Sequence, residues 1–367
     1  MKTALVTGAE GFIGRNLCQR LRERQVEVLG IGRGDAARLS DAAARADVIF
    51  HLAGVNRPKD PDEFHAGNVG FTELLCEALK AAGSQAPLIY ASSAKATEDS
   101  DYGRSKRAAE EILLGYGEAG GVPVHVFRLP NVFGKWVKPN YNSAVATFCH
   151  NIARGEGIEI HDPAARLDLV YIDDVVDAFL RIADGHSAAP GFAQVEPVYS
   201  TSVGEVAEII SSFPISRETM ITPRVGTGLV RALYSTYLSY LPQADFDYRV
   251  PVHGDPRGVF VEMLKTPDCG QFSYFTAGPG VTRGDHYHHT KAEKFLVISG
   301  TAHFGFRHIV SDECHEIVVR GGEGRVVETI PGWTHNITNI GSEELVVMLW
   351  ANEIFDRARP DTIAMKV

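Results

Sequence analysis

Four residues in the second half of the chain could together bind a metal ion. His286 and His288 are two residues apart, and side chains at that spacing on a strand point to the same side. Glu293 follows shortly after, and His335 lies further along the chain. Three imidazoles and a carboxylate are suitable ligands for a divalent metal such as Zn, Fe, Mn, Ni or Co. An isolated His-x-His pair is usually polar surface, so the predicted metal site depends on all four residues.

Tyr102 and Lys106 form a second pattern that could support catalysis. Residues four apart on a helix share a face, so this phenol and ammonium can meet at one site. A nearby cation lowers the pKa of a phenol, which can then exchange a proton with a carbonyl or alcohol oxygen. A Tyr–Lys pair at this spacing is also common on ordinary surfaces. The pair Ser92 and Ser93, which ends a preceding strand-like run, makes the catalytic interpretation more specific.

Gly8, Gly11 and Gly14 lie between a strand-like run and a helical stretch. Such glycines permit a tight turn and bring the N–H groups of a helix N-terminus close to a pyrophosphate. An ordinary strand-to-helix turn is the alternative interpretation. At the end of the next strand-like run, Arg33 occupies a region where an acidic residue would bind a ribose hydroxyl. An arginine there suits a 2′-phosphate and favours NADP over NAD, unless it is a surface residue without that contact.

Two different patterns of secondary structure must position these residues. Up to about residue 180, short apolar runs alternate with helical stretches, which predicts an α/β fold with a doubly wound parallel sheet of the Rossmann type. The predicted strands are Thr3–Thr7, Glu27–Ile31, Val48–Leu52, Leu88–Ala91 and Val124–Arg128. The predicted helices are Ile13–Arg24, Gly67–Ala82 and Tyr102–Leu114.

After about residue 244 the pattern changes to short strand-like runs separated by turns, which predicts an all-β barrel or sandwich. These runs are Asp245–Leu264, Gln271–Ala277, Glu293–Gly305, His315–Val319, Val326–Thr329 and Glu344–Trp350. Val225–Tyr240 is a candidate for the last helix of the first domain. The sequence therefore predicts two domains, residues 1–243 and residues 244–367.

Composition limits the classes of function. The net charge of −10 over 367 residues argues against a nucleic-acid partner. The five cysteines are scattered and include no Cys-x-x-Cys pair, which is typical of a reducing compartment. The sequence contains no recognisable signal peptide and no apolar run of the roughly 18 residues that a membrane span needs. We therefore expect a cytoplasmic protein with no membrane partner.

The first 240 or so residues contain further short motifs around these candidate residues. They are Thr7–Gly14, Asp47–Gly54, Tyr90–Ser93, Arg128–Gly134 and Tyr171–Asp174. Together with Tyr102 and Lys106 they resemble the extended short-chain dehydrogenase/reductase family, in particular its nucleotide-sugar-modifying members. This resemblance implies a catalytic triad in which Ser93 orients the carbonyl, Tyr102 supplies a proton, and Lys106 holds the ribose and lowers the tyrosine pKa. The choice of Ser93 over Ser92 follows the register of the family.

The same resemblance implies further contacts with cofactor and substrate. The implied contacts with the cofactor, NADPH, are Gly8, Gly11, Phe12, Ile13, Gly14, Arg33, Leu52, Ala53 and Lys106. Asn131 is implied to lie against the substrate or the nicotinamide.

The segment from Gly280 to Gly300 resembles the first motif of the cupin family, and His335 lies in a match to the second. Arg283 to Tyr287 resembles a narrower branch of cupins that epimerise nucleotide-linked 4-keto-6-deoxysugars, which implies a substrate contact at Arg283. Those epimerases generally work without metal and use a histidine at the position of His286 as base. The full ligand set instead favours metal ligation by His286.

Ligation of His286 leaves the base for epimerisation open. Metal-bound hydroxide, Tyr287 and Lys291 are the alternatives. The metal itself could act as a Lewis acid or serve only to stabilise the barrel.

The order of the two halves, together with the segment Phe133–Cys149, resembles the CapF family of capsular polysaccharide synthesis enzymes and their O-antigen counterparts. This resemblance extends over essentially the whole chain. The resemblance implies a zinc-containing homodimer that acts on UDP-2-acetamido-2,6-dideoxy-β-L-arabino-hex-4-ulose. The cupin half would invert C3, and the reductase half would then reduce C4 with NADPH to give UDP-2-acetamido-2,6-dideoxy-β-L-talose, on the route to N-acetyl-L-fucosamine. The alternatives are a reductase whose cupin half is structural or dimerising, and a cofactor-sensing regulator with two inactive sites.

Overall fold

The computed structural model describes residues 1–32, 35–58, 60, 62–186, 189–250, 252–255, 258–261, 264, 271–353 and 358–367. Their contacts form two compact units. Unit 1 contains residues 1–132 and 167–200, and unit 2 contains residues 133–166 and 201–367. The chain passes between the units inside or at the ends of three short strands, β6 (Asn131–Phe133), β7 (Arg166–Tyr171) and β9 (Tyr199–Ser202). A compact unit is not necessarily an independently folding domain, so the division into 1–243 and 244–367 stays a prediction.

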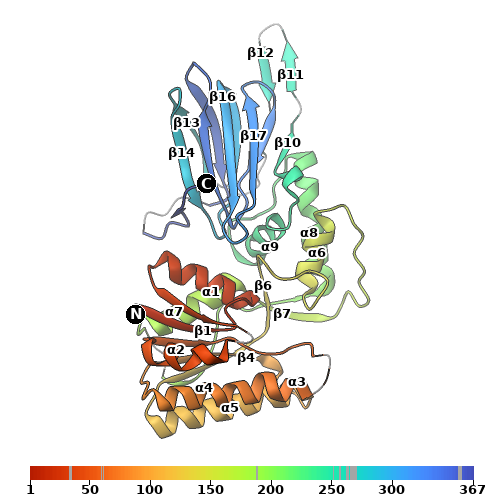
Figure 1. The fold of residues 1–367 in the computed structure, drawn as a ribbon. Coiled ribbons are helices and arrows are strands. Elements are labelled where there is room, and N and C mark those ends of the chain that lie inside the picture. The colour runs from red at the N-terminus through yellow and green to blue at the C-terminus, as the bar shows by residue number, and fades with distance from the viewer. Residues whose placement is uncertain are drawn as a thin grey trace. The chain divides into compact units, whose positions relative to one another are not determined.

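Unit 1 is built on a six-stranded sheet in the order β2-β1-β3-β4-β5-β8 (Figure 1). Its strands are β1 (Thr3–Thr7), β2 (Glu27–Ile31), β3 (Val48–His51), β4 (Leu88–Ser93), β5 (Val124–Leu129) and β8 (Gly191–Ala193). All neighbouring strands pair in parallel. This confirms the predicted Rossmann-like parallel sheet, to which the structure adds β8.

Helices flank this sheet, with α1 next to α7 and with α4 between α2 and α5 (Figure 1). The α-helices are α1 (Phe12–Glu23), α2 (Leu39–Arg45), α3 (Asp62–Phe64), α4 (Phe71–Ala81), α5 (Asp101–Gly120) and α7 (Ile172–Ala183). Unit 1 also contains three short helices. Two are 3-10 helices, η1 (Ala36–Arg38) and η3 (Ala94–Thr97), and one is a π-helix, η2 (His65–Gly70). Strand residues Leu5 and Leu88 share one apolar core with Leu79 of α4 and Leu113 of α5, and this core fixes the two helices against the sheet.

Three helices of unit 2 pack together: α6 (Ala144–Ile152), α8 (Val203–Thr219) and α9 (Gly228–Leu238). The helix expected in Val225–Tyr240 is α9, and it belongs by its contacts to unit 2. One reason is a hydrogen bond of 2.8 Å from the Ser235 hydroxyl to the backbone carbonyl of Thr290 in the β region.

The β region of unit 2 contains two five-stranded antiparallel sheets, in the orders β10-β18-β15-β20-β13 and β17-β16-β19-β14-β21. The first contains β10 (Asp247–Arg249), β13 (Gln271–Ala277), β15 (Glu293–Ser299), β18 (Arg325–Glu328) and β20 (Leu345–Ala351). The second contains β14 (Thr282–Tyr287), β16 (Thr301–His308), β17 (Cys314–Arg320), β19 (Trp333–Asn339) and β21 (Ile363–Ala364). A short 3-10 helix η4 (Gln243–Asp245) precedes them, and β11 (Val252–Asp255) pairs with β12 (Gly258–Val261). The predicted all-β character is confirmed.

The rings of Phe295 on β15 and Phe304 on β16 lie 5.8 Å apart, so the two sheets share a core. The prediction of one continuous run over Glu293–Gly305 was wrong. Gly300 adopts a φ of +86° and turns the chain from β15 into β16. A Cβ atom at this position would lie 3.0 Å from the Cα atom of Leu345, so the turn also needs the small residue.

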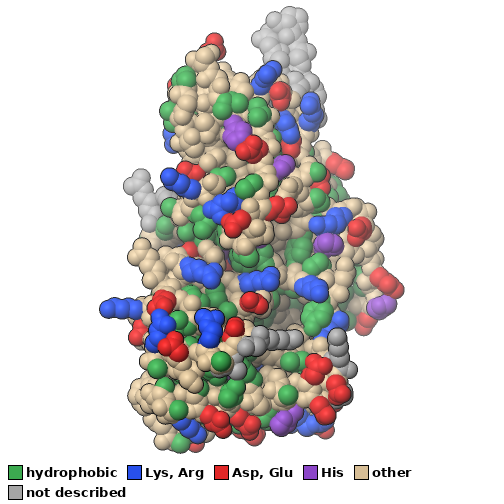
Figure 2. Space-filling view, in the orientation of Figure 1, with side chains coloured by type: hydrophobic (Ala, Val, Ile, Leu, Met, Phe, Trp, Pro, Cys, Tyr) green, Lys and Arg blue, Asp and Glu red, His purple; other side chains and the backbone are tan. Residues whose placement is uncertain are grey.

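The described residues contain no helix that is both long enough and apolar enough to cross a membrane. Figure 2 shows basic and acidic side chains interspersed over much of the visible face. The absence of a nucleic-acid partner stays a prediction.

We expect Gly14→Ala to destabilise the protein, because a Cβ atom at position 14 would lie 2.1 Å from the carbonyl oxygen of Gly8. Overpacking of this kind costs about 1–3 kcal/mol in the free energy of unfolding, which chemical denaturation can measure. The matched control is Gly115→Ala on α5, where a Cβ atom meets nothing within 4 Å. That control should stabilise the helix by about 0.5–1 kcal/mol. Equal stabilities of the two variants would contradict the close approach at Gly14.

Candidate functional site

The glycine-rich turn of unit 1 brings three backbone segments close together. Gly8 adopts a φ of +68°, and a Cβ atom there would lie 2.7 Å from the backbone nitrogen of Ala53. Gly11 donates a backbone hydrogen bond of 2.9 Å to Gly8 and is the N-cap of α1 without any side-chain cap. Phe12 and Ile13 therefore begin α1 with N–H groups that no capping side chain satisfies. This is the geometry that a dinucleotide pyrophosphate requires.

Leu52 and Ala53 follow β3 and lie directly beside this turn. Their backbone nitrogens each donate a hydrogen bond of 3.2 Å to the hydroxyl of Thr7. The same hydroxyl lies 2.7 Å from Nδ1 of His51, whose other ring nitrogen lies 2.8 Å from the hydroxyl of Thr72. Burial lowers the pKa of His51 to about 3, so its imidazole is neutral at physiological pH. A buried polar network thus holds the predicted cofactor-binding residues in place.

Ser93 and Tyr102 come together at the end of β4 and the start of α5. A hydrogen bond joins their side chains and lowers the pKa of Tyr102, but burial has the larger effect and raises that pKa above its ordinary value. The direction is opposite to the depression predicted from Lys106. A phenol with a raised pKa stays protonated near neutral pH, which is the form that donates a proton.

Lys106 is buried one helical turn after Tyr102. Its Nζ atom donates a hydrogen bond of 2.8 Å to the carbonyl of Ala91 and lies 4.4 Å from the centre of the Tyr90 ring. A Cβ atom on Gly54, just after the Leu52–Ala53 pair, would lie 3.8 Å from the same Nζ atom. Burial lowers the pKa of Lys106 to about 7. The ammonium therefore lies where the cofactor-binding strand end meets the Tyr102 helix.

Glu110, which was not among the predicted site residues, separates the surroundings of the two serines. Ser92 is buried, and its hydroxyl donates a hydrogen bond of 2.5 Å to the carboxylate of Glu110. The guanidinium of Arg128 donates to both oxygens of that carboxylate. Ser92 is thus engaged in a buried network, whereas Ser93 contacts Tyr102. Glu110 lies four residues after Lys106 on the same helix face, and this spacing was the available signal.

The other predicted contacts are more scattered. Asn131 is exposed at the start of β6 and donates a hydrogen bond of 3.3 Å to the backbone carbonyl of Asp168. Arg283 is exposed on β14, with its guanidinium 5.1 Å from the centre of the Phe275 ring. Arg33 lies outside the described residues.

In unit 2, the structure brings together His286, His288, Glu293 and His335. One ligand atom from each lies within 4.8 Å of the others. His286, the last residue but one of β14, lies beside His335 of β19, with ring centres 4.7 Å apart, and Glu293 begins β15. His288, Glu293 and His335 are buried. Three separate strands and the turn after β14 therefore build this cluster.

The hydrogen bonds of the cluster are consistent with a bound cation. Nδ1 of His288 donates its proton to the backbone carbonyl of Asp361, and in the tautomer that carries only this proton Nε2 is an acceptor. That Nε2 atom lies 3.1 Å from Oε2 of Glu293, which is also an acceptor. Nε2 of His335 is buried without a hydrogen-bond partner, 3.5 Å from the same oxygen. Electron pairs that converge in this way need a proton or a metal ion between them.

The protonation states suit metal ligation as well. Burial, and to a smaller extent the neighbouring His335 and His288, lower the pKa of His286 to about 4. Burial also lowers the pKa of His335. Burial raises the pKa of Glu293, but His288 and Lys291 hold it well below the usual range. Neutral imidazoles and an ionised carboxylate are the forms that bind metal.

Two of the alternatives for the epimerisation base are placed differently. Tyr287 lies between His286 and His288 along the chain, so its side chain takes the opposite face of the strand, where its ring lies 5.5 Å from that of His289. Nζ of Lys291 lies 2.6 Å from Oε1 of Glu293. Lys291 thus directly contacts one of the four residues of the cluster.

Comparison with known proteins shows two matching families. Residues 4–192 match the NAD dependent epimerase/dehydratase family, and residues 253–363 match the polysaccharide biosynthesis C-terminal domain. A UDP-2-acetamido-2,6-beta-L-arabino-hexul-4-ose reductase from Pseudomonas aeruginosa is 58% identical over 365 residues, which cover 99% of this chain and 98% of that protein.

Solved structures agree with these matches. The capsular polysaccharide assembling protein CapF from Staphylococcus aureus is 40% identical, with a TM-score of 0.68 and coverage of 100% of both chains. MoeE5 in complex with UDP-glucose and NAD is 27% identical, with a TM-score of 0.52, and the match covers 57% of this chain and 81% of that one.

We expect His335→Ala to contain less metal than the wild type, because it removes one of the four candidate ligands. Metal analysis of the purified protein should show a fall from a stoichiometric amount to traces. His303→Ala is the matched control, since His303 lies on β16 of the same sheet and contacts the largely exposed carboxylate of Glu316. Equal metal contents in the wild type and His335→Ala would rule out this cluster as the metal site.

Proposed function

The chain belongs to the CapF-like family of nucleotide-sugar enzymes, and on this basis we propose that it is a bifunctional UDP-4-ketosugar reductase with 3-epimerase activity. The proposed substrate is UDP-2-acetamido-2,6-dideoxy-β-L-arabino-hex-4-ulose, and the product is UDP-2-acetamido-2,6-dideoxy-β-L-talose. The pathway would be the synthesis of N-acetyl-L-fucosamine for capsule or O-antigen. The match to the Pseudomonas aeruginosa reductase over almost the whole of both chains supports this assignment.

The reductase half depends on the contact between Ser93 and Tyr102. Bound NADPH would supply a hydride to C4 of the sugar. Ser93 then orients the C4 carbonyl, and the protonated phenol of Tyr102 donates a proton to its oxygen. The buried ammonium of Lys106 is placed to hold the cofactor ribose. The raised pKa of Tyr102 supports its role as the acid in this direction of the reaction.

The β region of unit 2 is the proposed cupin and the proposed site of epimerisation. A 4-keto group acidifies the C3–H bond, because the resulting carbanion delocalises into an enolate. Removal of this proton and its return to the opposite face invert C3, and the subsequent reduction of the ketone prevents reversal. Arg283 is the proposed contact with the anionic substrate. Lys291, whose ammonium lies 2.6 Å from Glu293, is the proposed side chain for proton transfer.

Zinc is the proposed metal, held by His286, His288, Glu293 and His335. A divalent metal there would supply either Lewis acidity or a cross-link between strands. The burial of three of the four ligands favours the cross-link. It therefore supports a second candidate function, in which the chain is an NADPH-dependent ketosugar reductase whose cupin half is structural or dimerising. We further propose a homodimer in the cytoplasm.

Tyr102→Phe distinguishes the two functions. The variant lacks the proton donor, so C4 reduction should fall by roughly 10²–10⁴-fold. If the enzyme is bifunctional, the variant should still exchange the C3 proton of the ketosugar with D₂O in the absence of NADPH, as followed by NMR and mass spectrometry. Loss of both C4 reduction and C3 proton exchange in a folded variant would contradict the bifunctional proposal.

The same exchange assay with wild-type enzyme, before and after chelation, tests the role of the metal. Exchange that persists after complete metal removal would assign the metal a structural role.

Arg33→Ala tests the proposed preference for NADP. Loss of a guanidinium that contacts the 2′-phosphate should weaken NADPH binding much more than NADH binding. Fluorescence titration with both nucleotides measures the difference. Equal weakening of both would show that Arg33 does not contact the 2′-phosphate.

A further inference from the structure

The last residues of the chain contact the immediate surroundings of all three histidines in the metal-ligand cluster. In β21, Ala364 pairs with His286 of β14. The hydroxyl of Thr334, next to His335, donates a hydrogen bond to the carbonyl of Met365. The carbonyl of Asp361 accepts the Nδ1 proton of His288. We call residues 361–367 the C-terminal strap.

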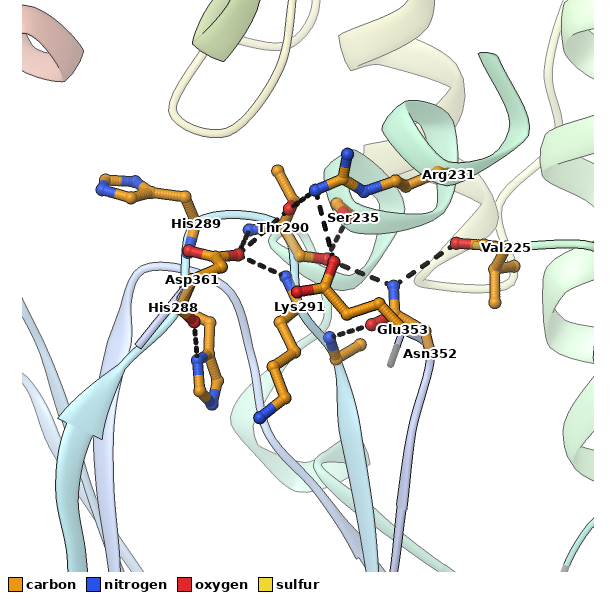
Figure 3. Close-up of polar contacts among 11 residues, drawn as sticks. Val225, Arg231, Ser235, His288, His289, Thr290, Lys291, Asn352, Glu353 and Asp361 are labelled. Carbon is orange, nitrogen blue, oxygen red and sulfur yellow. Dashed lines mark hydrogen bonds and ion pairs between the residues drawn. The ribbon is translucent and has the colours of Figure 1, made fainter. Parts of the chain in front are cut away.

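Asp361 makes the densest set of these contacts (Figure 3). One carboxylate oxygen accepts the backbone N–H of His289 at 2.8 Å. The other accepts the backbone N–H groups of Thr290 and Lys291, both at 2.7 Å, and the hydroxyl of Thr290 at 3.0 Å. A single carboxylate thus satisfies three consecutive backbone donors. These donors form the turn between two ligands, His288 and Glu293.

Two further residues of unit 2, Ser235 and Asn352, also form hydrogen bonds with this turn (Figure 3). The Ser235 hydroxyl of α9 donates a hydrogen bond of 2.8 Å to the carbonyl of Thr290. The side-chain oxygen of Asn352 accepts the backbone N–H of Ala292 at 2.9 Å. These contacts hold the end of the turn near Glu293. Asp361 accepts the hydrogen bonds of the backbone N–H groups in residues 289–291.

Asp361 also determines which ring nitrogen of His288 is available to a metal. A backbone carbonyl can only accept, so the Asp361 carbonyl retains the proton on Nδ1 and leaves the lone pair on Nε2. That nitrogen faces Glu293. Outer hydrogen bonds of this kind orient histidine ligands and increase their basicity.

We propose that Asp361 is a positioning residue for the metal site, and that the C-terminal strap and the metal bind to the barrel cooperatively. The inference rests on the proposed function of the four-residue cluster as a metal site. Asp361 fixes the backbone of the turn with its carboxylate and the tautomer of His288 with its carbonyl. Because coupling between two sites is reciprocal, a bound metal must in turn stabilise the docked strap.

The direct test is the zinc affinity of full-length Asp361→Asn, measured by competition with a chromophoric chelator. The amide preserves the size of the side chain but replaces one oxygen, so it cannot accept all four hydrogen bonds. Affinity should fall by about 10–100-fold. The matched control is Glu316→Gln, an exposed carboxylate on β17 at the opposite edge of the same sheet. This control should bind zinc as the wild type does.

A spectroscopic readout separates positioning from general stability. The ¹⁵N shifts of the His288 ring should show Nδ1 protonated and Nε2 bound to zinc in the wild type. In Asp361→Asn, the turn is freed, and these signals should broaden or divide between tautomers. Unchanged zinc affinity and unchanged ring signals in the variant would overturn the inference.

If Asp361→Asn fails to fold, amide hydrogen exchange of the wild-type protein still tests the coupling between the metal and the C-terminal strap. The amides of residues 289–291 and 363–366 should exchange more slowly with zinc than after chelation, and identical exchange would contradict the coupling. If wild-type protein binds no zinc at all, the metal site itself is wrong. If it binds zinc and Asp361→Asn binds equally tightly, only the role of Asp361 is wrong.

Discussion

A polar group removed from water must regain its hydrogen bonds or its charge partner, and this requirement shapes both sites. In unit 1, the buried ammonium of Lys106 is held by the carbonyl of Ala91, and the buried carboxylate of Glu110 is held by Arg128. In unit 2, the carboxylate of Asp361 satisfies three consecutive backbone N–H groups. Each pairing fixes a backbone segment that carries a candidate functional residue. The interactions that satisfy the buried polar groups therefore also position the candidate functional residues.

Burial also sets the protonation states on which the proposed chemistry depends. It raises the pKa of Tyr102 and lowers that of Lys106, so the phenol is kept as an acid while the amine becomes easier to deprotonate. In the metal-ligand cluster it keeps His286 and His335 neutral. The two proposed reactions are chemically linked, because the 4-keto group that acidifies C3 is the group that reduction removes. A protein that performs both steps makes the inversion at C3 irreversible.

Local sequence patterns predicted most of the parallel sheet of unit 1, because β1 to β5 are apolar runs whose period and bounding turns are visible in the chain. They did not predict β8 or β19. Strand β8 has three residues and joins the sheet only through its pairing with β5. The end of β15 was also missed, because the turn at Gly300 depends on a close approach to Leu345, which is distant in sequence. The grouping of α9 with unit 2 follows from its packing against α6 and α8 and from its hydrogen bond to Thr290, which no local pattern reveals.

The sequence by itself determined which residues could do chemistry: the three glycines, Tyr102 with Lys106, and the four candidate metal ligands. Each is a pattern of residue type and short spacing, apart from His335. Only the tertiary structure decided that Ser93 rather than Ser92 contacts Tyr102. The hydroxyl of Ser92 is hydrogen-bonded to the carboxylate of Glu110 instead. Only the tertiary structure brought Asp361 to the turn after His288, because the contact joins residues 73 positions apart along the chain. Long-range pairing of buried polar groups is a property of the packed chain and leaves no periodic signal in the sequence.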